Sequence, residues 1–329
     1  MCGIIVSESK VKKLKEGLQK LNRRGPDQSK IIEKDNHLFM FNRLSIMGLD
    51  DNGMQPFFHN EKILVANAEI YNYKQIKAEL KMFPFKSDSD CEVLLPLFEV
   101  LDVDMFAYLD AEFAIVLYDG KRKRFVAARD PLGIRPLFYG YSKEDNKIIF
   151  ASEVKAIIDF VHKVIAFPPG HYYLNGRFVK FSTVLEIDQY HEDTFDVMLE
   201  EIRTKLTNAI VKRLDSDAPI GFLLSGGLDS SLVCSIATKY LKKPIRTFSI
   251  GMVKDAIDLK YAKQVSEYLG SEHTEVYMTK QEVIDSLEEI IYSLETFDIT
   301  TIRASVGMYL LSKYIHKNTD IKVLLTGEV

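Results

Sequence analysis

The chain changes its pattern of elements near residue 190, and this change constrains the fold more than any other feature of the sequence. Before it, short strands follow one another with turns between them, as in EFAIVLYDG (112–120) and RFVAARD (124–130), which is typical of antiparallel sheet. After it, strands and helices alternate, as in PIGFLLSGG (219–227) and DSSLVCSIATKYL (229–241), which is typical of a doubly wound parallel sheet. A chain of 329 residues is long enough for two domains, and we place them at 1–190 and 191–329.

Both parts contain segments whose apolar spacing predicts regular structure. The expected helices of the first part are 11–24, 73–83 and 91–101, and a long amphipathic helix is expected at 192–215. Further extended segments are expected at 2–7, 30–46 and 62–72. The basic run KRKR (121–124) lies between two expected strands and is interpreted as the turn of a β-hairpin.

The composition excludes several classes of protein. Hydrophobic residues make up 47% of the chain and charged residues 27%, which is typical of a globular protein and not of a disordered one. The formal net charge of -4 argues against a protein that coats nucleic acid or an anionic membrane. We also find no apolar stretch of membrane-spanning length and no signal-peptide pattern.

The cysteines indicate a reducing compartment. The chain has three cysteines, which are widely spaced and include no CxxC pair. We therefore expect neither a disulfide scaffold nor a zinc site, and we expect a cytoplasmic location. Cys91 and Cys234 fall in segments expected to be helical, where buried and unreactive thiols are the usual finding. Cys2, by the same reasoning, is first interpreted as a small apolar residue entering a strand.

The segment LLSGGLDSS (223–231) is the sharpest local signal in the chain. An apolar strand runs into Gly226 and Gly227, which allow a tight turn and a close approach to an anion, and a helix follows. The helix start presents unpaired N–H groups to a phosphate. Asp229 could hold Mg²⁺ against that phosphate. Additional hydroxyl donors come from Ser225, Ser230 and Ser231. The absence of GK[ST] distinguishes this loop from the common P-loop.

This loop resembles the pyrophosphate-binding motif of ATP-pyrophosphatase-type enzymes, and together with the initial MCGI the chain resembles glutamine-hydrolysing asparagine synthetases. Further motifs match that family in order along nearly the whole chain: RRGPD (23–27), NRLSI (42–46), NAEIYN (67–72), SDCE (89–92), ARDPLGIRPLFY (128–139), FASEVKAI (150–157), FPPGHYY (167–173), TFSIG (247–251), LETFDITTIRAS (294–305) and VLLTGE (323–328).

For the first part, the resemblance implies an α+β N-terminal-nucleophile glutaminase fold, with two stacked antiparallel sheets flanked by helices. Cys2 would attack the glutamine side-chain amide once Met1 is removed, and its own α-amine would act as the base. The oxyanion would be held by the Asn67 side chain and the backbone N–H of Ala68. Arg43 would hold the α-carboxylate, and Asp90 with Glu69 would receive the α-ammonium. The implied glutamine-binding set is completed by Leu44, Ser45 and Ile46.

For the second part, the resemblance implies a partial α/β doubly wound domain that uses ATP and Mg²⁺ to convert aspartate to β-aspartyl-AMP, which ammonia then converts to asparagine. The implied ATP-binding residues are Leu224, Ser225, Gly226, Gly227, Asp229, Ser230, Ser231, Ile250, Thr326 and Gly327. Asp229 would also be the metal ligand, and Thr300, Thr301 and Arg303 would surround aspartate. Glu328 matches a glutamate that supports formation of the intermediate. The family often dimerises, so a homodimer is an implied state.

The sequence departs from the family pattern at two places. Ala68 stands where the family usually has glycine, and we expect a weaker glutaminase if the backbone there has positive φ. The family continues SGEGSDE, whereas this chain reads TGEV and stops at Val329, so we expect an incomplete synthetase domain.

Several readings of the function therefore stay open. A truncated chain could act as a glutaminase alone, or be an inactive remnant that binds nucleotide. Other amidotransferases share the first domain, but SGGLDSS and LETFDITTIRAS argue against them. The β-lactam synthetases share the two-domain layout, but Cys2 favours the use of glutamine.

Overall fold

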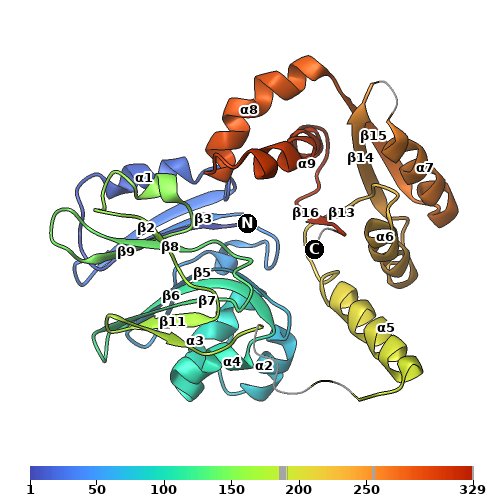
Figure 1. Ribbon diagram of the computed structural model, residues 1–329. Helices are drawn as coiled ribbons and strands as arrows, with labels where there is room; N and C mark the ends of the chain where they lie inside the picture. The colour runs from blue at the N-terminus through green and yellow to red at the C-terminus, as the bar shows by residue number, and fades with distance from the viewer. Residues whose placement is uncertain (185–189, 191, 254–255, 328–329) are drawn as a thin grey trace. The chain divides into compact units, whose positions relative to one another are not determined.

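The computed structural model describes residues 1–184, 190, 192–253 and 256–327. The chain divides into two compact units, Met1–Tyr190 (unit 1) and His191–Val329 (unit 2). Each unit has its own sheets and its own apolar core (Figure 1).

Unit 1 contains two six-stranded sheets in which all paired strands are antiparallel. The first sheet has the order β10 (Ile165–Ala166), β8 (Phe138–Tyr141), β9 (Ile148–Ala151), β1 (Gly3–Ser7), β3 (His37–Arg43) and β2 (Gln28–Lys34). The second has the order β12 (Arg177–Lys180), β11 (His171–Leu174), β7 (Arg124–Arg129), β6 (Ala111–Asp119), β5 (Lys62–Ile70) and β4 (Phe57–His59).

The two sheets are stacked, and helices cover their outer faces. All five residues of β1 are buried, because Ile4 and Val6 pack against the second sheet while Ile5 points to the opposite face. That opposite face is covered by α1 (Leu14–Lys20) and η4 (Val154–Ala156). The outer face of the second sheet is covered by α2 (Tyr73–Glu79), η2 (Asp90–Val93), α3 (Leu94–Leu101), η3 (Asp102–Asp104) and α4 (Met105–Tyr108). The expected arrangement of two stacked antiparallel sheets flanked by helices is confirmed.

The expected helices of unit 1 are present but shorter than predicted, for local reasons. After α1, the Asn42 amide donates to Leu18 O (2.9 Å) and so takes up a carbonyl at the helix end. The helix expected at 91–101 starts as the 3₁₀ turn η2 because Pro96, in the first turn of α3, has no N–H to donate. The first three residues of the KRKR run lie in the turn between β6 and β7, as expected, and Arg124 is the first residue of β7.

Unit 2 contains one four-stranded parallel sheet in the order β15 (Glu272–Met278), β14 (Arg246–Met252), β13 (Ile220–Leu223) and β16 (Val323–Leu325). Its helices in chain order are α5 (Phe195–Lys212), α6 (Leu228–Tyr240), α7 (Ile257–Leu269), α8 (Lys280–Leu294) and α9 (Ile299–Asn318). Residues of α6 and α7 pack on one face of the sheet and residues of α9 on the other. The expected parallel sheet with flanking helices is confirmed.

The strand order places a topological switch point between β13 and β16. The chain passes from β13 to β14 and β15 on one side, and returns to β16 on the other side of β13. In open parallel sheets, ligands bind beyond the carboxyl ends of the strands at such a point. Unit 2 therefore has a defined place for a ligand.

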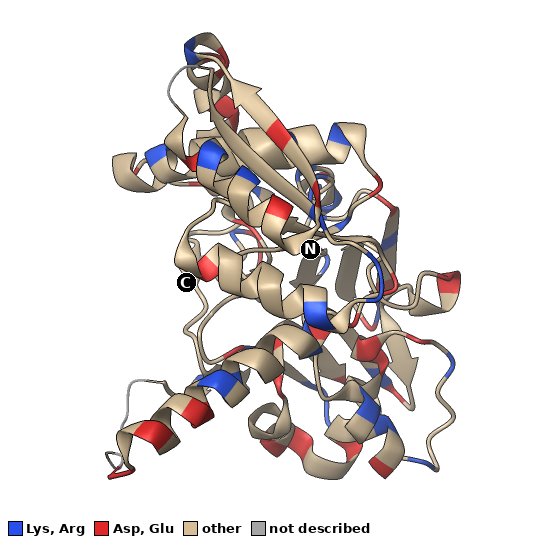
Figure 2. Cartoon of the chain, turned by 90° about the vertical axis from the view of Figure 1, so that its right-hand side faces the viewer, with Lys and Arg blue, Asp and Glu red and all other residues tan. Residues whose placement is uncertain are grey.

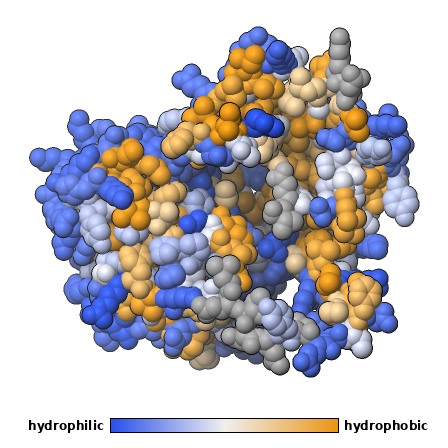
Figure 3. Space-filling view, viewed as in Figure 1, coloured by the Kyte–Doolittle hydropathy of each residue, from blue (hydrophilic) through white to orange (hydrophobic). Residues whose placement is uncertain are grey.

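The surface of unit 2 is partly apolar. Figure 2 shows acidic and basic residues interspersed over the elements, and along α5 they form exposed pairs such as Arg203 with Glu200 (3.3 Å). Figure 3 shows apolar patches over α5 and α8. The exposed apolar residues of these helices include Phe195, Leu199, Ile202, Ile284 and Ile291. In the described part of the chain, every helix is too short or too polar to cross a membrane.

Candidate active site

Cys2, directly before β1, contacts Asn67 in the middle of β5. The Cys2 backbone N–H donates to Asn67 Oδ1 at 3.0 Å. The other polar atom of this side chain, Asn67 Nδ2, is buried and has no hydrogen-bond partner among the described residues. Leaving a buried donor unpaired costs about 1–3 kcal/mol, so such a group calls for an explanation, of which a catalytic role is one. Asn67 therefore presents an unused donor beside Cys2.

The edge of β5 that faces away from β6 provides backbone donors at the same place. Alternate residues of an antiparallel strand point their N–H groups to opposite edges. On this edge the Ala66 N–H donates to Gln55 Oε1 (2.6 Å), and the Ile70 N–H donates to Asp90 Oδ2 (2.7 Å). Ala68 lies between them, so its N–H points to the same edge, where it borders the pocket that contains Cys2.

The backbone of Ala68 corrects one sequence-based expectation. Ala68 lies inside β5, pairs with Phe113 of β6, and is not among the residues with positive φ. An extended strand accepts a Cβ without strain. The premise on which we expected Ala68 to weaken a glutaminase is therefore wrong.

Cys2 is partly buried, and its thiol lies against the backbone of Leu44. The Leu44 N–H donates to Cys2 Sγ at 3.5 Å, and the Leu44 carbonyl lies 3.7 Å from the same sulfur. Burial raises the pKa of the Cys2 thiol above its usual value, although the Leu44 N–H opposes this. Because the thiolate is the nucleophile, a thiol in this environment needs a base beside it.

Arg24 fixes the position of Cys2 and was not singled out by the sequence. Its Nε donates to the Cys2 carbonyl at 2.9 Å, and its Nη1 pairs with Glu153 at 3.0 Å. Both side chains of this pair are largely buried, 11% and 14% exposed. The motif RRGPD, which contains Arg24, was the signal that could have identified it.

A small cavity of about 30 Å³ lies next to the thiol. Its lining includes the expected residues Cys2, Arg43, Leu44, Ile46, Ala68, Glu69 and Asp90. Two expected residues do not line it. Asn67 reaches Cys2 from the side, and Ser45 is buried with its N–H donated to Asp27 Oδ2 (2.8 Å). Gln55 and Cys91 line the cavity and were not predicted as site residues.

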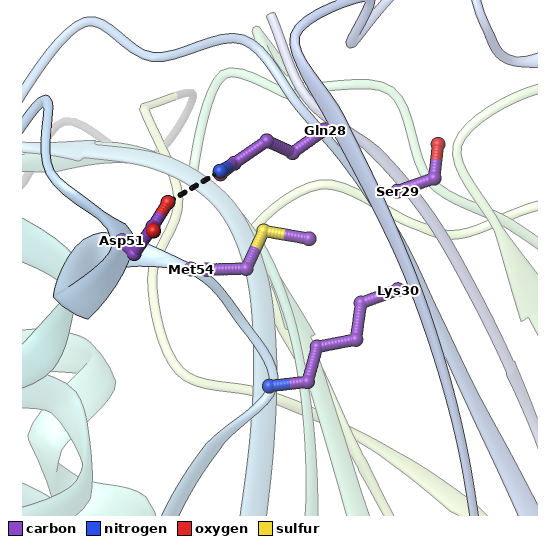
Figure 4. A pocket seen from close by; sticks show the side chains of 5 residues that line it. All are labelled: Gln28, Ser29, Lys30, Asp51 and Met54. Carbon is purple, nitrogen blue, oxygen red and sulfur yellow. Dashed lines mark hydrogen bonds between the residues drawn. The ribbon is translucent and has the colours of Figure 1, made fainter.

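The Arg43 guanidinium is held by the loop that follows β3. It donates to the carbonyls of Asp50 (2.6 Å) and Gly48, and to Gln28 Oε1 (3.2 Å). Gln28 in turn donates to Asp51 Oδ1 at 2.6 Å (Figure 4). These two residues border a second pocket of about 400 Å³, together with Ser29, Lys30 and Met54. Gln28 thus links Arg43, in the wall of the small cavity, to Asp51 at the second pocket.

Glu69, which is partly buried, and Asp90, which is buried, form an acidic pair in the cavity wall. Burial, reinforced by the charge of Asp90, raises the pKa of Glu69 to about 8. Burial also raises the pKa of Asp90. Arg135 opposes the shift at Glu69, with its Nη2 3.9 Å from Glu69 and 3.5 Å from Glu112. An acidic pair of this kind suits a cationic group of a ligand.

Unit 2 contains a larger pocket, of about 840 Å³, at its switch point. It is bordered by the carboxyl ends of β13 and β16, by residues 248–250 in the middle of β14 and by the middle of α9. The expected nucleotide-binding residues that line it are Leu224, Ser225, Gly227, Asp229, Ser230, Ile250, Thr326 and Gly327. Gly226 and Ser231 do not line it.

Two glycines allow the loops around this pocket to pack closely against the backbones of α7 and α6. Gly226 has φ +81°, and a Cβ there would lie 2.5 Å from Ala262 N on α7. A Cβ on Gly327, after β16, would clash with the backbone N of Ser230. Gly227 is the N-cap of α6, so the first N–H groups of that helix face the pocket region. The local sequence therefore forms the tight turn between a strand and a helix that was expected.

Asp229 is suitably placed for a metal ion that also binds phosphate. It is exposed and borders the pocket. The described ranges contain no cluster of three or more His, Cys, Asp or Glu that could hold a metal alone. Mg²⁺ usually binds through one or two carboxylates together with substrate phosphates, so a single carboxylate here fits that ion.

The expected aspartate-binding residues lie beside this pocket and not in its wall. Thr300, Thr301 and Arg303 are exposed near the start of α9, where Asp298 caps the helix by accepting from the Thr301 N–H (2.7 Å). The pocket is lined by later residues of the helix, from Ala304 to Leu311. Glu328 lies outside the described residues.

Comparisons with known proteins give a family match for each part of the chain. Residues 1–181 match the family model of the glutamine amidotransferase domain, and residues 201–329 match that of asparagine synthase. Among curated relatives, asparagine synthetase [glutamine-hydrolyzing] 2 of Oryza sativa is 40% identical over 100% of this chain and 58% of its own length. Asparagine synthetase [glutamine-hydrolyzing] 1 of Saccharomyces cerevisiae is 38% identical over 94% of this chain and 60% of its own length.

Solved structures include a glutamine phosphoribosylpyrophosphate amidotransferase from B. subtilis, with a TM-score of 0.49 and 16% identity over 83% of this chain and 65% of that one. The chain spans a little under 60% of the length of the first curated relatives it matches. By both of its domains, the chain belongs to the family of glutamine-hydrolysing asparagine synthetases.

Proposed function

We propose that this chain releases ammonia from glutamine at the Cys2 site and uses ATP at the unit 2 pocket to activate aspartate for asparagine synthesis. The single observation that carries the first half is the arrangement of Cys2 and Asn67. One atom of the Asn67 amide accepts from the Cys2 nitrogen at 3.0 Å, and the other is a buried donor that has no partner in the described part of the chain.

The first half-reaction follows from the chemistry of an N-terminal cysteine. Removal of Met1 converts the Cys2 nitrogen from an amide into an amine, which can accept the thiol proton. The sulfur then attacks the glutamine amide carbon, and Asn67 Nδ2 and the Ala68 N–H stabilise the oxyanion. The amine returns its proton to the leaving ammonia, and water hydrolyses the thioester to glutamate.

Glutamine recognition would use the charged wall of the cavity. Arg43 is the cation available for the α-carboxylate, although its guanidinium now donates to the loop carbonyls of Gly48 and Asp50. Asp90 and Glu69 would receive the α-ammonium. The cavity measures about 30 Å³, so it would have to widen to admit glutamine.

The second half-reaction would take place in the unit 2 pocket. Leu224 and Ile250 would flank the adenosine, and the segment 225–231 with Thr326 and Gly327 would bind the phosphates. Mg²⁺, held by Asp229, would neutralise phosphate charge when bound. The aspartate β-carboxylate attacks the α-phosphate, pyrophosphate leaves, and ammonia displaces AMP from the acyl-adenylate. Thr300, Thr301 and Arg303 would hold aspartate, and Glu328 would assist formation of the intermediate.

The test of the first half combines mass spectrometry with an assay of glutamate release. We expect loss of Met1 and activity that Cys2→Ala abolishes. Cys234→Ala is the matched control, since it removes a buried thiol from the apolar core of unit 2. Retention of Met1, or full activity of Cys2→Ala, would refute the proposal.

The second half is tested by ATP/pyrophosphate exchange that depends on aspartate. Exchange by the wild-type chain supports the synthetase reaction. Glutamate release without exchange would instead assign this chain the function of a glutaminase, and ATP binding without either reaction would indicate a nucleotide-binding remnant.

A further inference from the structure

A chain of hydrogen bonds runs between β14 and β15 of unit 2 and ends at the nucleotide pocket. His273 of β15 lies between two side chains of β14: its Nδ1 is 2.9 Å from Thr247 Oγ1, and its Nε2 is 3.0 Å from Ser249 Oγ. Thr247 Oγ1 is also 2.9 Å from Ser271 Oγ, which donates to Ser266 Oγ at 3.0 Å. At the other end of the chain, Ser249 is buried and borders the pocket.

The far end of this chain sets the direction of every bond in it. The Ser271 hydroxyl donates its one proton to Ser266 Oγ at 3.0 Å. In the 2.9 Å bond between Thr247 Oγ1 and Ser271 Oγ, Thr247 must therefore be the donor. Thr247 Oγ1 must then accept from His273, so Nδ1 of the ring carries the proton.

The direction of these hydrogen bonds fixes the role of Ser249. Burial lowers the pKa of His273, so the ring is neutral near pH 7. With the proton on Nδ1, Nε2 is an acceptor, and the Ser249 hydroxyl donates to it. Because the Ser249 hydroxyl has given its only proton to His273, its oxygen can only accept further hydrogen bonds.

We propose that Ser249 is a hydrogen-bond acceptor in the nucleotide pocket, and that His273 is the positioning residue that holds it in this role. The inference rests on the proposed function of unit 2. The ligand group that Ser249 recognises is an N–H or O–H donor, because a carbonyl at the same place would find no donor. In a nucleotide, such donors are the exocyclic amino group of adenine and the ribose hydroxyls.

Two substitutions of His273 separate its two bonds. An asparagine amide can occupy the position of Nδ1 and keep the bond to Thr247, while it cannot reach Ser249. A glutamine amide can occupy the position of Nε2 and accept from Ser249, while the bond to Thr247 is lost. The pair therefore distinguishes a specific role of Ser249 from a general role of His273 in packing.

The experiment is calorimetric titration of the full chain with MgATP. We expect Ser249→Ala and His273→Asn to weaken binding by about three- to tenfold, the weight of one neutral hydrogen bond. His273→Gln should bind within about twofold of wild type. Thermal unfolding of each variant checks that the sheet is intact. Titration with ITP and with 2′-deoxy-ATP identifies the donor, since Ser249→Ala should no longer discriminate against the analogue that lacks it.

The outcomes separate this inference from the function it rests on. No binding of MgATP by wild type overturns both. Binding by wild type with equal affinities for His273→Asn and His273→Gln overturns the inference alone. A ¹⁵N NMR spectrum tests the tautomer of His273 without any nucleotide. The His273 ring signals are assigned by their loss in His273→Gln, and they should be those of the Nδ1–H tautomer. An Nε2–H ring would contradict the proposal.

Discussion

Glu69 links the electrostatics of the glutamine cavity to the pH of the medium. Its pKa of about 8 is a consequence of burial and of the neighbouring Asp90, and Arg135 limits the shift. Below this pH the Glu69 carboxyl is neutral and offers little attraction to an ammonium group. Above it, the carboxylate is ionised and can pair with the α-ammonium of glutamine.

Glutamine binding should therefore strengthen as the pH rises through about 8. The measurement is the Kd for glutamine in a Cys2→Ala background, which removes both turnover and the titration of the thiol. In that background, Arg135→Gln should move the midpoint of the profile to higher pH, because a positive charge that lowers the pKa of Glu69 is lost. Glu69→Gln is the control and should flatten the profile; an unchanged pH dependence in this variant would assign the titration to another group.

The residues of the glutamine cavity differ in whether the sequence alone could identify them as part of the site. Cys2, Asn67 and Asp90 lie in motifs, and the structure brings them to one place. Gln55 lies in no motif, and its role in capping Ala66 depends on a loop folding back along β5. Arg135 was inside a motif, but its pairing with Glu69 joins a loop to a strand, and no local pattern encodes such a contact.

At the scale of elements, β5 determines how the oxyanion donors are aligned. Because Ala68 has an extended backbone within this strand, Ala68→Gly should not raise the rate of glutamate release by more than about twofold. Its effect should be on stability, since glycine in a strand costs roughly 0.5–1 kcal/mol relative to alanine. Ala66→Gly is the matched control on the same edge of the strand. A large gain in rate for Ala68→Gly alone would show that the side chain does misplace the N–H.

The turn between β13 and α6 offers a second prediction at this scale. Gly226→Ala should destabilise unit 2 by more than the about 1–2 kcal/mol expected for a left-handed residue, because its Cβ also meets the backbone of α7. Gly270→Ala separates the two effects, since Gly270 has φ +64° and an added Cβ would meet nothing within 4 Å among the residues that the structure describes beyond its chain neighbours. Chemical denaturation of both variants gives the difference, and equal losses of stability would show that the close approach to α7 is unimportant.

For the whole molecule, the sequence could predict both kinds of sheet because strand and helix periodicities are local. It could not predict the order of the strands in unit 1, where β1 lies between β9 and β3. That order depends on pairing between segments more than a hundred residues apart, as in Val6 with Phe150. It is this pairing that puts Cys2 at the end of a central strand.

The two units differ in how well they bury their apolar residues, and they should differ in stability. Unit 1 has three large buried clusters, and strands such as β1 and β6 contribute residues with no exposed surface. The two clusters of unit 2 are smaller, and residues such as Phe195, Phe297 and Ile299 are more than two-thirds exposed. Since buried apolar area is the main source of stability, unit 2 should unfold at lower denaturant than unit 1. Hydrogen exchange should show faster exchange of the β13 and β14 amides than of those in β1 and β6. In a urea titration, binding of MgATP should be lost before glutamate release, and a single transition that abolishes both together would show that the units unfold as one.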